Sequence, residues 1–337
     1  MSIQIGNLTL RNRVFLAPMS GVTDEAFRVV AHAHGAGLVV SEMVAGEELA
    51  RERPDMVRRA RGQSRISPFV IQLAGREAKW MAEGARLAED LGADLIDINM
   101  GCPARQVTGG FSGSALMRDP DHALSLIEAT VKATSRPVSV KMRLGWDHTC
   151  LNAPDIARRA QEVGVQMVTV HGRTRNMFYT GKADWSAIRA VREAITIPLV
   201  ANGDGETAAD ARAMMDASGA DAVMFGRSTY GRPWWPGAVA HALDPALGRP
   251  EPTLEEERDI LLWQQDETLK LYGAALGNKT FRKHLGWTIA RLELRGFLSA
   301  EATAATRAAL LTSRDNAVVA MGIRDTYARL CDESEAA

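Results

Sequence analysis

The sequence has little cysteine, and its charges nearly cancel. Only three of the 337 residues are cysteines, Cys102, Cys150 and Cys331, which is too few and too scattered for a disulfide framework or a zinc knuckle. The formal net charge is −1, so any binding of nucleic acid has to come from local basic patches rather than from a field around the whole protein.

Signals for secretion and membrane insertion are lacking as well. Met1 is followed by polar-alternating sequence without the basic and apolar segments of a signal peptide. No apolar run reaches the roughly 18 to 20 residues that a membrane helix needs. Hydrophobic residues make up 46% of the chain and charged residues 24%, which is enough for a substantial core. We therefore expect a soluble cytoplasmic protein.

Short apolar segments recur along the first three quarters of the chain, and each runs into a polar or glycine-rich loop. Helical patterns separate most of them. A small hairpin is expected ahead of them, at residues 3–10. The expected strands are residues 14–17, 38–40, 68–73, 95–98, 138–142, 167–170, 198–201 and 222–225.

Eight strand–helix units in this length of chain fit a (β/α)8 TIM barrel, which we predict for residues 1–248. An open doubly wound sheet is the alternative, but it would place a GxGxxG turn after the first strand, where this chain has APMSG. Beyond Pro250 and Pro252 the pattern becomes helical, so we predict a separate all-α helical-bundle domain at residues 249–337. Its expected helices are 254–274, 278–293, 299–312 and 314–330.

Polar side chains gather at the carboxyl ends of the predicted strands, where TIM barrels place their active sites. Each could serve the structure alone: Lys141 could pair with Asp97, and His171 could be a hydrogen-bonded core histidine. Together on one rim they indicate a binding site. The set is Ser20, Gln72, Asn99, Cys102, Lys141, His171, Asn202, Asp204 and Arg227.

Cys102 follows one of these strand ends directly. A free cysteine is most often a small buried hydrophobe. This one lies in a loop just past a strand's carboxyl end and ahead of the rigid Pro103, a position that favours a chemical role.

Glycines mark the last two loops, Asn202-Gly203-Asp204-Gly205 and Gly226-Arg227. Such loops let backbone N–H groups approach a phosphate. The rim shows no His-x-His, His-Glu-x-x-His or carboxylate cluster, so we predict no metal. With Lys141 and Gln72 available for a polar ring, the ligand we predict is flavin mononucleotide (FMN).

Several blocks of this rim resemble the bacterial tRNA-dihydrouridine synthases, most closely the B-type branch, known historically as a nitrogen-regulation protein. The resemblance covers essentially the whole chain. One departure is visible after Val107, where the family often carries a basic residue and this chain has Gly109-Gly110-Phe111 before Ser112. We expect it to affect the mobility of the loop rather than the role of Cys102. The matching blocks are APMSGVTD at 17–24, IQLAG at 71–75, DINMGCP at 97–103, VKMR at 140–143, VHGRT at 170–174, NGD at 202–204 and GR at 226–227.

The resemblance implies an FMN-containing barrel, expected to act as a monomer, that reduces uridines in the D-loop of tRNA to 5,6-dihydrouridine with NADPH as reductant. Hydride would pass from flavin N5 to C6, and Cys102 would be the catalytic acid that protonates C5. By match of motifs, the cofactor-binding residues would be Pro18, Met19, Ser20, Gln72, Asn99, Lys141, His171, Asn202, Gly203, Asp204, Gly226 and Arg227.

A tRNA substrate requires a basic surface and a base turned out of the folded RNA. Residues 51–65 and 279–295 are rich in arginine and lysine, although such runs are usually solvated helix faces. His171 and Arg173 could hold the flavin, the uracil or an RNA phosphate. The rival functions are an FMN barrel acting on a free pyrimidine and a tRNA-binding protein whose chemistry is incidental. The predicted tRNA contacts are Arg143, Arg173, Lys279, Arg282, Lys283 and His284.

Overall fold

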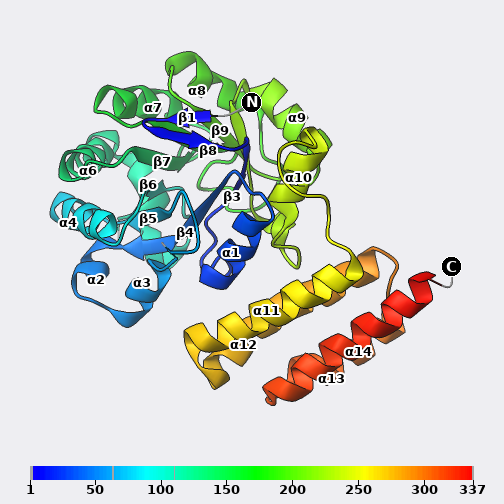
Figure 1. Ribbon diagram of the computed structural model, residues 1–337. Helices are drawn as coiled ribbons and strands as arrows, with labels where there is room; N and C mark the ends of the chain where they lie inside the picture. The colour runs from blue at the N-terminus through cyan, green and yellow to red at the C-terminus, as the bar shows by residue number, and fades with distance from the viewer. Residues whose placement is uncertain (1–2, 63, 110, 336–337) are drawn as a thin grey trace. The chain divides into compact units, whose positions relative to one another are not determined.

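A computed structural model describes residues 3–62, 64–109 and 111–335 of the chain (Figure 1). The chain divides into two compact units. The first comprises Met1–Ser228 and Pro236–Arg249, and the second comprises Thr229–Trp235 and Pro250–Ala337.

The first unit holds a closed barrel of parallel strands in the order β10-β3-β4-β5-β6-β7-β8-β9, so the predicted TIM barrel is confirmed. Each strand pairs with its sequence neighbour, and β10 closes the barrel on β3. The strands are β3 Val14–Leu16, β4 Leu38–Ala45, β5 Val70–Ala74, β6 Leu95–Met100, β7 Val138–Arg143, β8 Met167–His171, β9 Leu199–Asn202 and β10 Ala222–Phe225.

Strand β4 is longer than the sequence pattern indicates. We expected it to end before Ser41, but it continues to Ala45 with a register shift between Val40 and Met43. The hydroxyl of Ser41 accepts the backbone N–H of Gln72 at 2.9 Å. A side-chain hydroxyl therefore provides the hydrogen-bond partner for the backbone of β5 where the register shifts. The residues that follow Val40, which include polar side chains but no glycine, therefore continue the strand instead of ending it.

Helices follow the strands around the barrel (Figure 1). Asp24 begins the first of them by accepting the backbone N–H of Phe27 at 3.1 Å. The α-helices are α1 Glu25–Ala33, α2 Gly46–Ala50, α3 Pro54–Arg59, α4 Ala78–Asp90, α5 Arg105–Thr108, α6 Pro120–Ala133, α7 Ala153–Glu162, α8 Arg189–Ala194, α9 Ala208–Ser218 and α10 Trp235–Leu243, and the 3₁₀ turns are η1 Gly113–Arg118, η2 Ser186–Ile188 and η3 Arg227–Thr229.

The predicted hairpin is confirmed as β1 Ile3–Ile5 paired antiparallel with β2 Leu8–Leu10 (Figure 1). Its apolar side chains belong to the same buried cluster as Leu38, Leu95 and Met167, which start the barrel strands. The hairpin therefore closes the amino-terminal end of the barrel. The carboxyl ends of the strands remain as the end at which a ligand can bind.

Along the strands, the inward-facing side chains change from apolar to polar. Val70 and Leu95 belong to the apolar cluster near the amino-terminal ends. Because successive side chains alternate between faces, Gln72, Asp97 and Asn99 share the inward face with them, nearer the carboxyl ends. The alternation of side chains along the strands therefore places a layer of polar side chains inside the barrel, on the carboxyl-terminal side of the apolar cluster.

The second unit is built on α11 Leu254–Tyr272, α12 Ala274–Leu294, α13 Ala300–Thr312 and α14 Asn316–Glu335, close to the helices we predicted. Their buried faces form one apolar cluster that includes Leu261, Phe281, Leu285 and Tyr327. No helix in the described part of the chain is long and apolar enough to cross a membrane.

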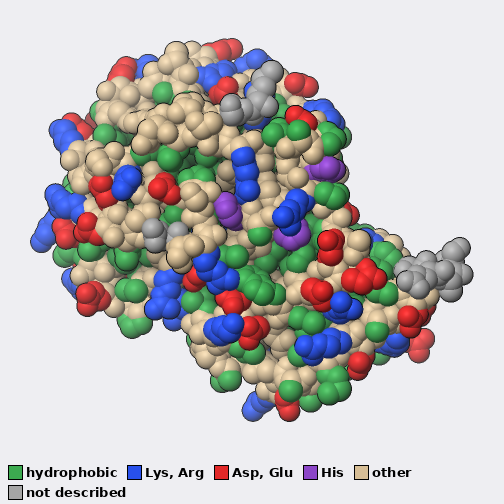
Figure 2. Space-filling model, viewed as in Figure 1, with side chains coloured by type: hydrophobic (Ala, Val, Ile, Leu, Met, Phe, Trp, Pro, Cys, Tyr) green, Lys and Arg blue, Asp and Glu red, His purple; other side chains and the backbone are tan. Residues whose placement is uncertain are grey.

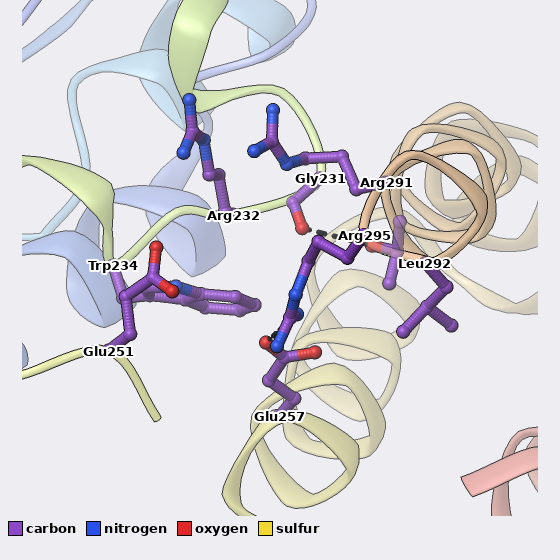
Figure 3. Close-up of a pocket in the computed structure, with 9 residues that line it drawn as sticks. Gly231, Arg232, Trp234, Glu251, Glu257, Arg291, Leu292 and Arg295 are labelled. Carbon is purple, nitrogen blue, oxygen red and sulfur yellow. Dashed lines mark hydrogen bonds and ion pairs between the residues drawn. The ribbon is translucent and has the colours of Figure 1, made fainter. Parts of the chain in front are cut away.

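An ion pair in which only the acidic partner is buried lies beside that cluster. Figure 3 shows Arg295, just past α12, facing Glu257 of α11, and the two are hydrogen-bonded. The hydroxyl of Tyr327 also donates to Glu257, at 3.4 Å. Burial raises the pKa of Glu257, and the Arg295 guanidinium opposes that rise. Removing Arg295 would leave the buried carboxylate of Glu257 without its cation, which is costly.

Shortening Ile5 tests the closure of the barrel by the hairpin. Ile5 is fully buried, so Ile5→Ala should lower the free energy of unfolding by about 2–5 kcal/mol through a cavity at the base of the barrel. The measurement is equilibrium unfolding in urea. Thr9→Ala, on the exposed face of the same hairpin, is the control and should change stability by less than about 0.5 kcal/mol. Equal effects of the two substitutions would contradict the closure.

Candidate active site

A chain of hydrogen bonds runs from the barrel interior to the loop that carries Cys102. The carboxylate of Asp97 accepts from Gln72 Nε2 and from Ser139 Oγ, each at 2.6 Å. Gln72 Oε1 accepts from Asn99 Nδ2 at 2.8 Å. Asn99 Oδ1 then accepts the backbone N–H of Cys102 at 3.0 Å and that of the preceding glycine at 3.2 Å. Three strands therefore fix where the Cys102 loop begins.

The donors and acceptors in this series of hydrogen bonds can be arranged in only one direction, because an ionised carboxylate accepts hydrogen bonds and donates none. Asp97 turns the NH₂ group of Gln72 toward itself, which turns the Gln72 oxygen toward Asn99. Burial raises the pKa of Asp97 to about 6, although the hydrogen bonds from Gln72 and Ser139 and the charge of Lys141 oppose the rise. At neutral pH Asp97 is therefore mostly ionised.

The Cys102 loop is held at a second point. The carbonyl of Cys102 accepts from the backbone N–H of Ser114 at 3.0 Å and from its hydroxyl at 2.9 Å. Gly113 allows this approach: its φ is +60°, and an added Cβ would lie 2.8 Å from the Cys102 carbonyl oxygen. The thiol is free and partly exposed. In the departure from the family pattern, Phe111 has φ +58° and is 71% exposed, and Gly110 lies outside the described residues.

Lys141 of β7 pairs with Asn202 of β9. Its Nζ donates to Asn202 Oδ1 at 2.9 Å, and Asn202 Nδ2 donates to the backbone carbonyl of Met224 at 2.8 Å. The hydrogen bond considered from the sequence, to Asp97, is replaced by this one. Burial, together with the charge of Arg143, lowers the pKa of Lys141 to about 8. A single cation thus lies at the centre of the polar layer.

The buried Arg173 forms a two-pronged ion pair with Asp204, whose side chain is 28% exposed. Arg173 is 2% exposed, and its two terminal nitrogens donate to the two oxygens of Asp204 at 2.8 and 2.6 Å. Burial alone would raise the pKa of Asp204, but the hydrogen bonds from Arg173 and from the Ala183 N–H outweigh it and lower that pKa. Arg227, half-exposed, reaches the same carboxylate at 3.3 Å. Two cations and one anion leave a positive charge here.

His171 lies against this group, with its Nε2 at 3.3 Å from a terminal nitrogen of Arg173. Burial and the nearby charges of Lys141 and Arg143 hold the pKa of His171 well below its ordinary value. At neutral pH the ring is therefore uncharged and can act as a hydrogen-bonding group rather than as a cation.

Two glycines of the last two loops, Gly203 and Gly226, lie where a side chain would have no room or would narrow the opening at the carboxyl end of the barrel. Gly203 has φ +124°, and an added Cβ would lie 2.8 Å from His171 Cδ2. A Cβ on Gly226 would extend between the side chains of Ala17 and Met19, each 3.7 Å away. The N–H of Ala17 also donates to the Phe225 carbonyl, so the first and last strands join at this point. Pro18 and Met19 are partly exposed and Ser20 is exposed.

Arg143 is buried and organises loops. It is 1% exposed; its Nε donates to the carbonyl of Gly101, and one terminal nitrogen donates to the carbonyls of Thr174 and Phe178, each at 2.8 Å. Burial lowers the pKa of Arg143 to about 10. Arg143 and Arg173 were predicted to contact tRNA, and their burial gives that prediction no support.

Of the predicted tRNA contacts in the helical unit, Lys279 is exposed and Lys283 is partly exposed. Arg282 donates to the carbonyl of Ser313 at 2.7 Å, at the end of α13. His284 is 2% exposed, and burial lowers its pKa to about 3, so it is a neutral core residue. Its ring meets Trp287 edge-on, with the ring centroids 5.4 Å apart. Burial therefore gives the prediction for His284 no support either.

The arginine-rich segment 51–65 is partly neutralised by its own neighbours. Arg51 pairs with Glu47, and Arg53 pairs with both Glu48 and Asp55. Figure 2 shows acidic and basic side chains interspersed over the face in view. Among the described residues there is also no group of three or more His, Cys, Asp or Glu side chains that could hold a metal ion.

Two residues of the hydrogen-bonded series in the barrel interior, Asp97 and Ser139, were not among the predicted site residues. The sequence interpretation treated Asp97 only as a possible partner of Lys141, although Asp97 lies two residues before Asn99 and so shares its inward face. It did not name Ser139, which lies two residues before Lys141 for the same reason.

Comparison with known proteins agrees with the resemblance described above. The family described as dihydrouridine synthase matches residues 15–318. A probable tRNA-dihydrouridine synthase of Rhizobium leguminosarum bv. phaseoli is 56% identical over 314 residues, which cover 93% of this chain and 94% of that protein. The tRNA-dihydrouridine synthase B of Xanthomonas campestris pv. campestris is 44% identical over 285 residues, covering 85% of this chain and 86% of that protein.

Solved structures show likeness of fold. Morphinone reductase in complex with tetrahydroNAD superposes with a TM-score of 0.51 at 16% identity, covering 75% of this chain and 92% of that one. That likeness supports the barrel and nothing finer. The family match and the close relatives decide the assignment: the chain belongs to the dihydrouridine synthase family of enzymes.

Proposed function

We propose that this protein reduces the C5=C6 bond of uridines in the D-loop of tRNA to 5,6-dihydrouridine, using FMN and NADPH. The observation that carries the proposal is the carboxyl end of the barrel, where hydrogen bonds through Asp97, Gln72 and Asn99 hold the backbone at Cys102. Lys141 lies opposite Asn99 in the register of β6 and β7. The names of relatives covering nearly the whole chain support the same substrate.

The donor set fits FMN in charge and in hydrogen-bonding groups. Lys141 suits the N1/O2 edge of the flavin, where negative charge collects on reduction, and the amides of Gln72 and Asn99 suit its other polar atoms. The net positive charge of Arg173, Asp204 and Arg227 suits a phosphate. The loops that would border the flavin are completed by Pro18, Met19, Ser20, His171, Asn202, Gly203 and Gly226.

When bound and reduced by NADPH, FMN supplies the hydride that adds to C6 of the uracil ring. Negative charge then develops at C5 and O4, and a proton has to reach C5. We assign this proton to the Cys102 thiol, since a thiol both stays protonated near neutral pH and gives up its proton readily. Asn99 holds the backbone at Cys102, and the Lys141 cation offsets the developing charge.

The direct test of the function is one reaction with purified protein, NADPH and tRNA that lacks dihydrouridine. Nucleoside mass spectrometry should show a gain of two hydrogens at a D-loop uridine, because reduction adds one hydride and one proton. A protein that oxidises NADPH and reduces free uracil while leaving tRNA unchanged would contradict the tRNA assignment and favour a small-pyrimidine reductase.

Replacing Cys102 tests the assignment of the acid. Cys102→Ala should keep the affinities for FMN and tRNA but lower turnover by roughly 10²–10⁴-fold, the usual contribution of a positioned proton donor. Cys150→Ala is the matched control, since Cys150 is also a free, partly exposed cysteine. It should leave turnover unchanged. Full turnover by Cys102→Ala would exclude Cys102 as the acid.

The charge of Lys141 should make flavin binding depend on pH. Because the pKa of Lys141 is lowered to about 8, the ammonium is present below this pH and is lost as pH rises through it. FMN affinity of the flavin-free protein should therefore fall above pH 8, by about tenfold for one charge-assisted hydrogen bond. Quenching of FMN fluorescence measures it.

Lys141→Gln provides the comparison, because glutamine can still donate to Asn202 but carries no charge. This variant should bind FMN more weakly at pH 7 and lose the fall in affinity above pH 8. If it shows the same affinity and the same pH profile as the native protein, Lys141 does not contact the flavin.

A further inference from the structure

Two arginines are stacked on one tryptophan at the carboxyl end of the barrel. Arg118 ends η1, Trp146 follows β7, and Arg175 follows β8. The guanidinium carbon of Arg118 lies 4.9 Å from the centroid of the Trp146 ring, and that of Arg175 lies 4.5 Å from it. Arg175 also lies 4.7 Å from the ring of Phe178. The aromatic rings thus hold both guanidiniums in place.

This cluster adjoins the loop of Cys102. The N–H of Arg175 donates to the carbonyl of Gly145 at 3.0 Å, which ties the loops after β7 and β8 together. A terminal nitrogen of Arg175 reaches Thr108 Oγ1, in the Cys102 loop, at 3.5 Å. The η1 turn that ends at Arg118 begins at Gly113, against the Cys102 carbonyl.

The charge of the two arginines is not neutralised. Among the described residues, neither Arg118 nor Arg175 forms an ion pair with a carboxylate. The acidic residues next to this cluster in the sequence have other partners: Asp119, which follows Arg118, accepts from the His122 N–H, and Asp147, which follows Trp146, accepts from Thr149. The Nε of Arg175 is buried and has no hydrogen-bond partner. Arginines of segment 51–65, by contrast, pair with neighbouring acids.

We propose that Arg118, Trp146 and Arg175 form a grip for the ribose–phosphate backbone beside the target uridine. The proposal rests on the proposed function, since it concerns the same tRNA. Turning a base into the barrel mouth leaves the flanking phosphates at the rim of the mouth. Guanidiniums bind phosphate in two-pronged fashion. Stacking on Trp146 lowers the entropy lost when they do so, because the side chains are already ordered.

The test is the salt dependence of tRNA affinity, measured by fluorescence anisotropy for the FMN-bound protein. Arg118→Ala and Arg175→Ala should each weaken binding by roughly tenfold and reduce the slope of log K against log salt by roughly 0.7–0.9, as expected for one lost phosphate contact. Arg118→Glu should weaken binding further. NADPH oxidation without tRNA and FMN affinity should stay at native values.

Arg158→Ala is the matched control, since Arg158 is an exposed barrel arginine already paired with Asp155 and Glu162. It should leave the slope unchanged. Arg118→Lys separates charge from geometry: it should keep the slope but bind less tightly, because lysine lacks the planar fork.

The failure of this inference and the failure of the proposed function are distinguishable. If the native protein converts tRNA and both alanine variants keep the native slope, the grip is absent while the function stands. If the variants lose no more affinity than Arg158→Ala does, the same conclusion follows. If the native protein neither binds nor converts tRNA, the proposed function itself fails and the grip fails with it.

Discussion

The active-site loop depends on one buried carboxylate. Placing Asp97 inside the barrel would be costly if it were unpaired, and the structure offsets that cost with donors from Gln72 and Ser139 and with the nearby charge of Lys141. Because a carboxylate only accepts, it orients the Gln72 amide, which orients Asn99, which in turn holds the backbone N–H of Cys102. The loop that carries the proposed acid, Cys102, is therefore held in place by hydrogen bonds from the barrel strands.

The positively charged side chains at the carboxyl end of the barrel fall into two groups with different roles. Arg143 and Arg173 are buried and donate hydrogen bonds to loop carbonyls and to Asp204, so they fix the shape of the barrel mouth. Lys141 remains near its centre with a single neutral partner, and Arg227 remains half-exposed at its edge. A chain with a net charge of −1 can therefore still present local cationic sites, which the proposed function requires for a flavin and for an RNA.

The barrel could be predicted from the sequence because each strand is a short apolar run with its own polar ending, and such signals are local. The end of β4 could not be predicted in this way. Ser41 is a residue type common in loops, and only the structure shows that its hydroxyl accepts the N–H of Gln72 on the neighbouring strand. The burial of Arg143 and His284 was equally invisible, because residue type alone does not tell whether a basic side chain points outward. Asp97 was within reach: alternation places it on the same face as Asn99.

We propose that the polar layer above the apolar cluster of the barrel is the flavin site and that Cys102 faces it. A crystal structure of the protein soaked with FMN tests this most directly. We expect the phosphate to lie against the loops of Gly203 and Gly226, the ring to contact Lys141, and the thiol of Cys102 to face the ring across the space left for a uracil. Flavin bound away from Lys141, or a Cys102 thiol directed away from the ring, would contradict it.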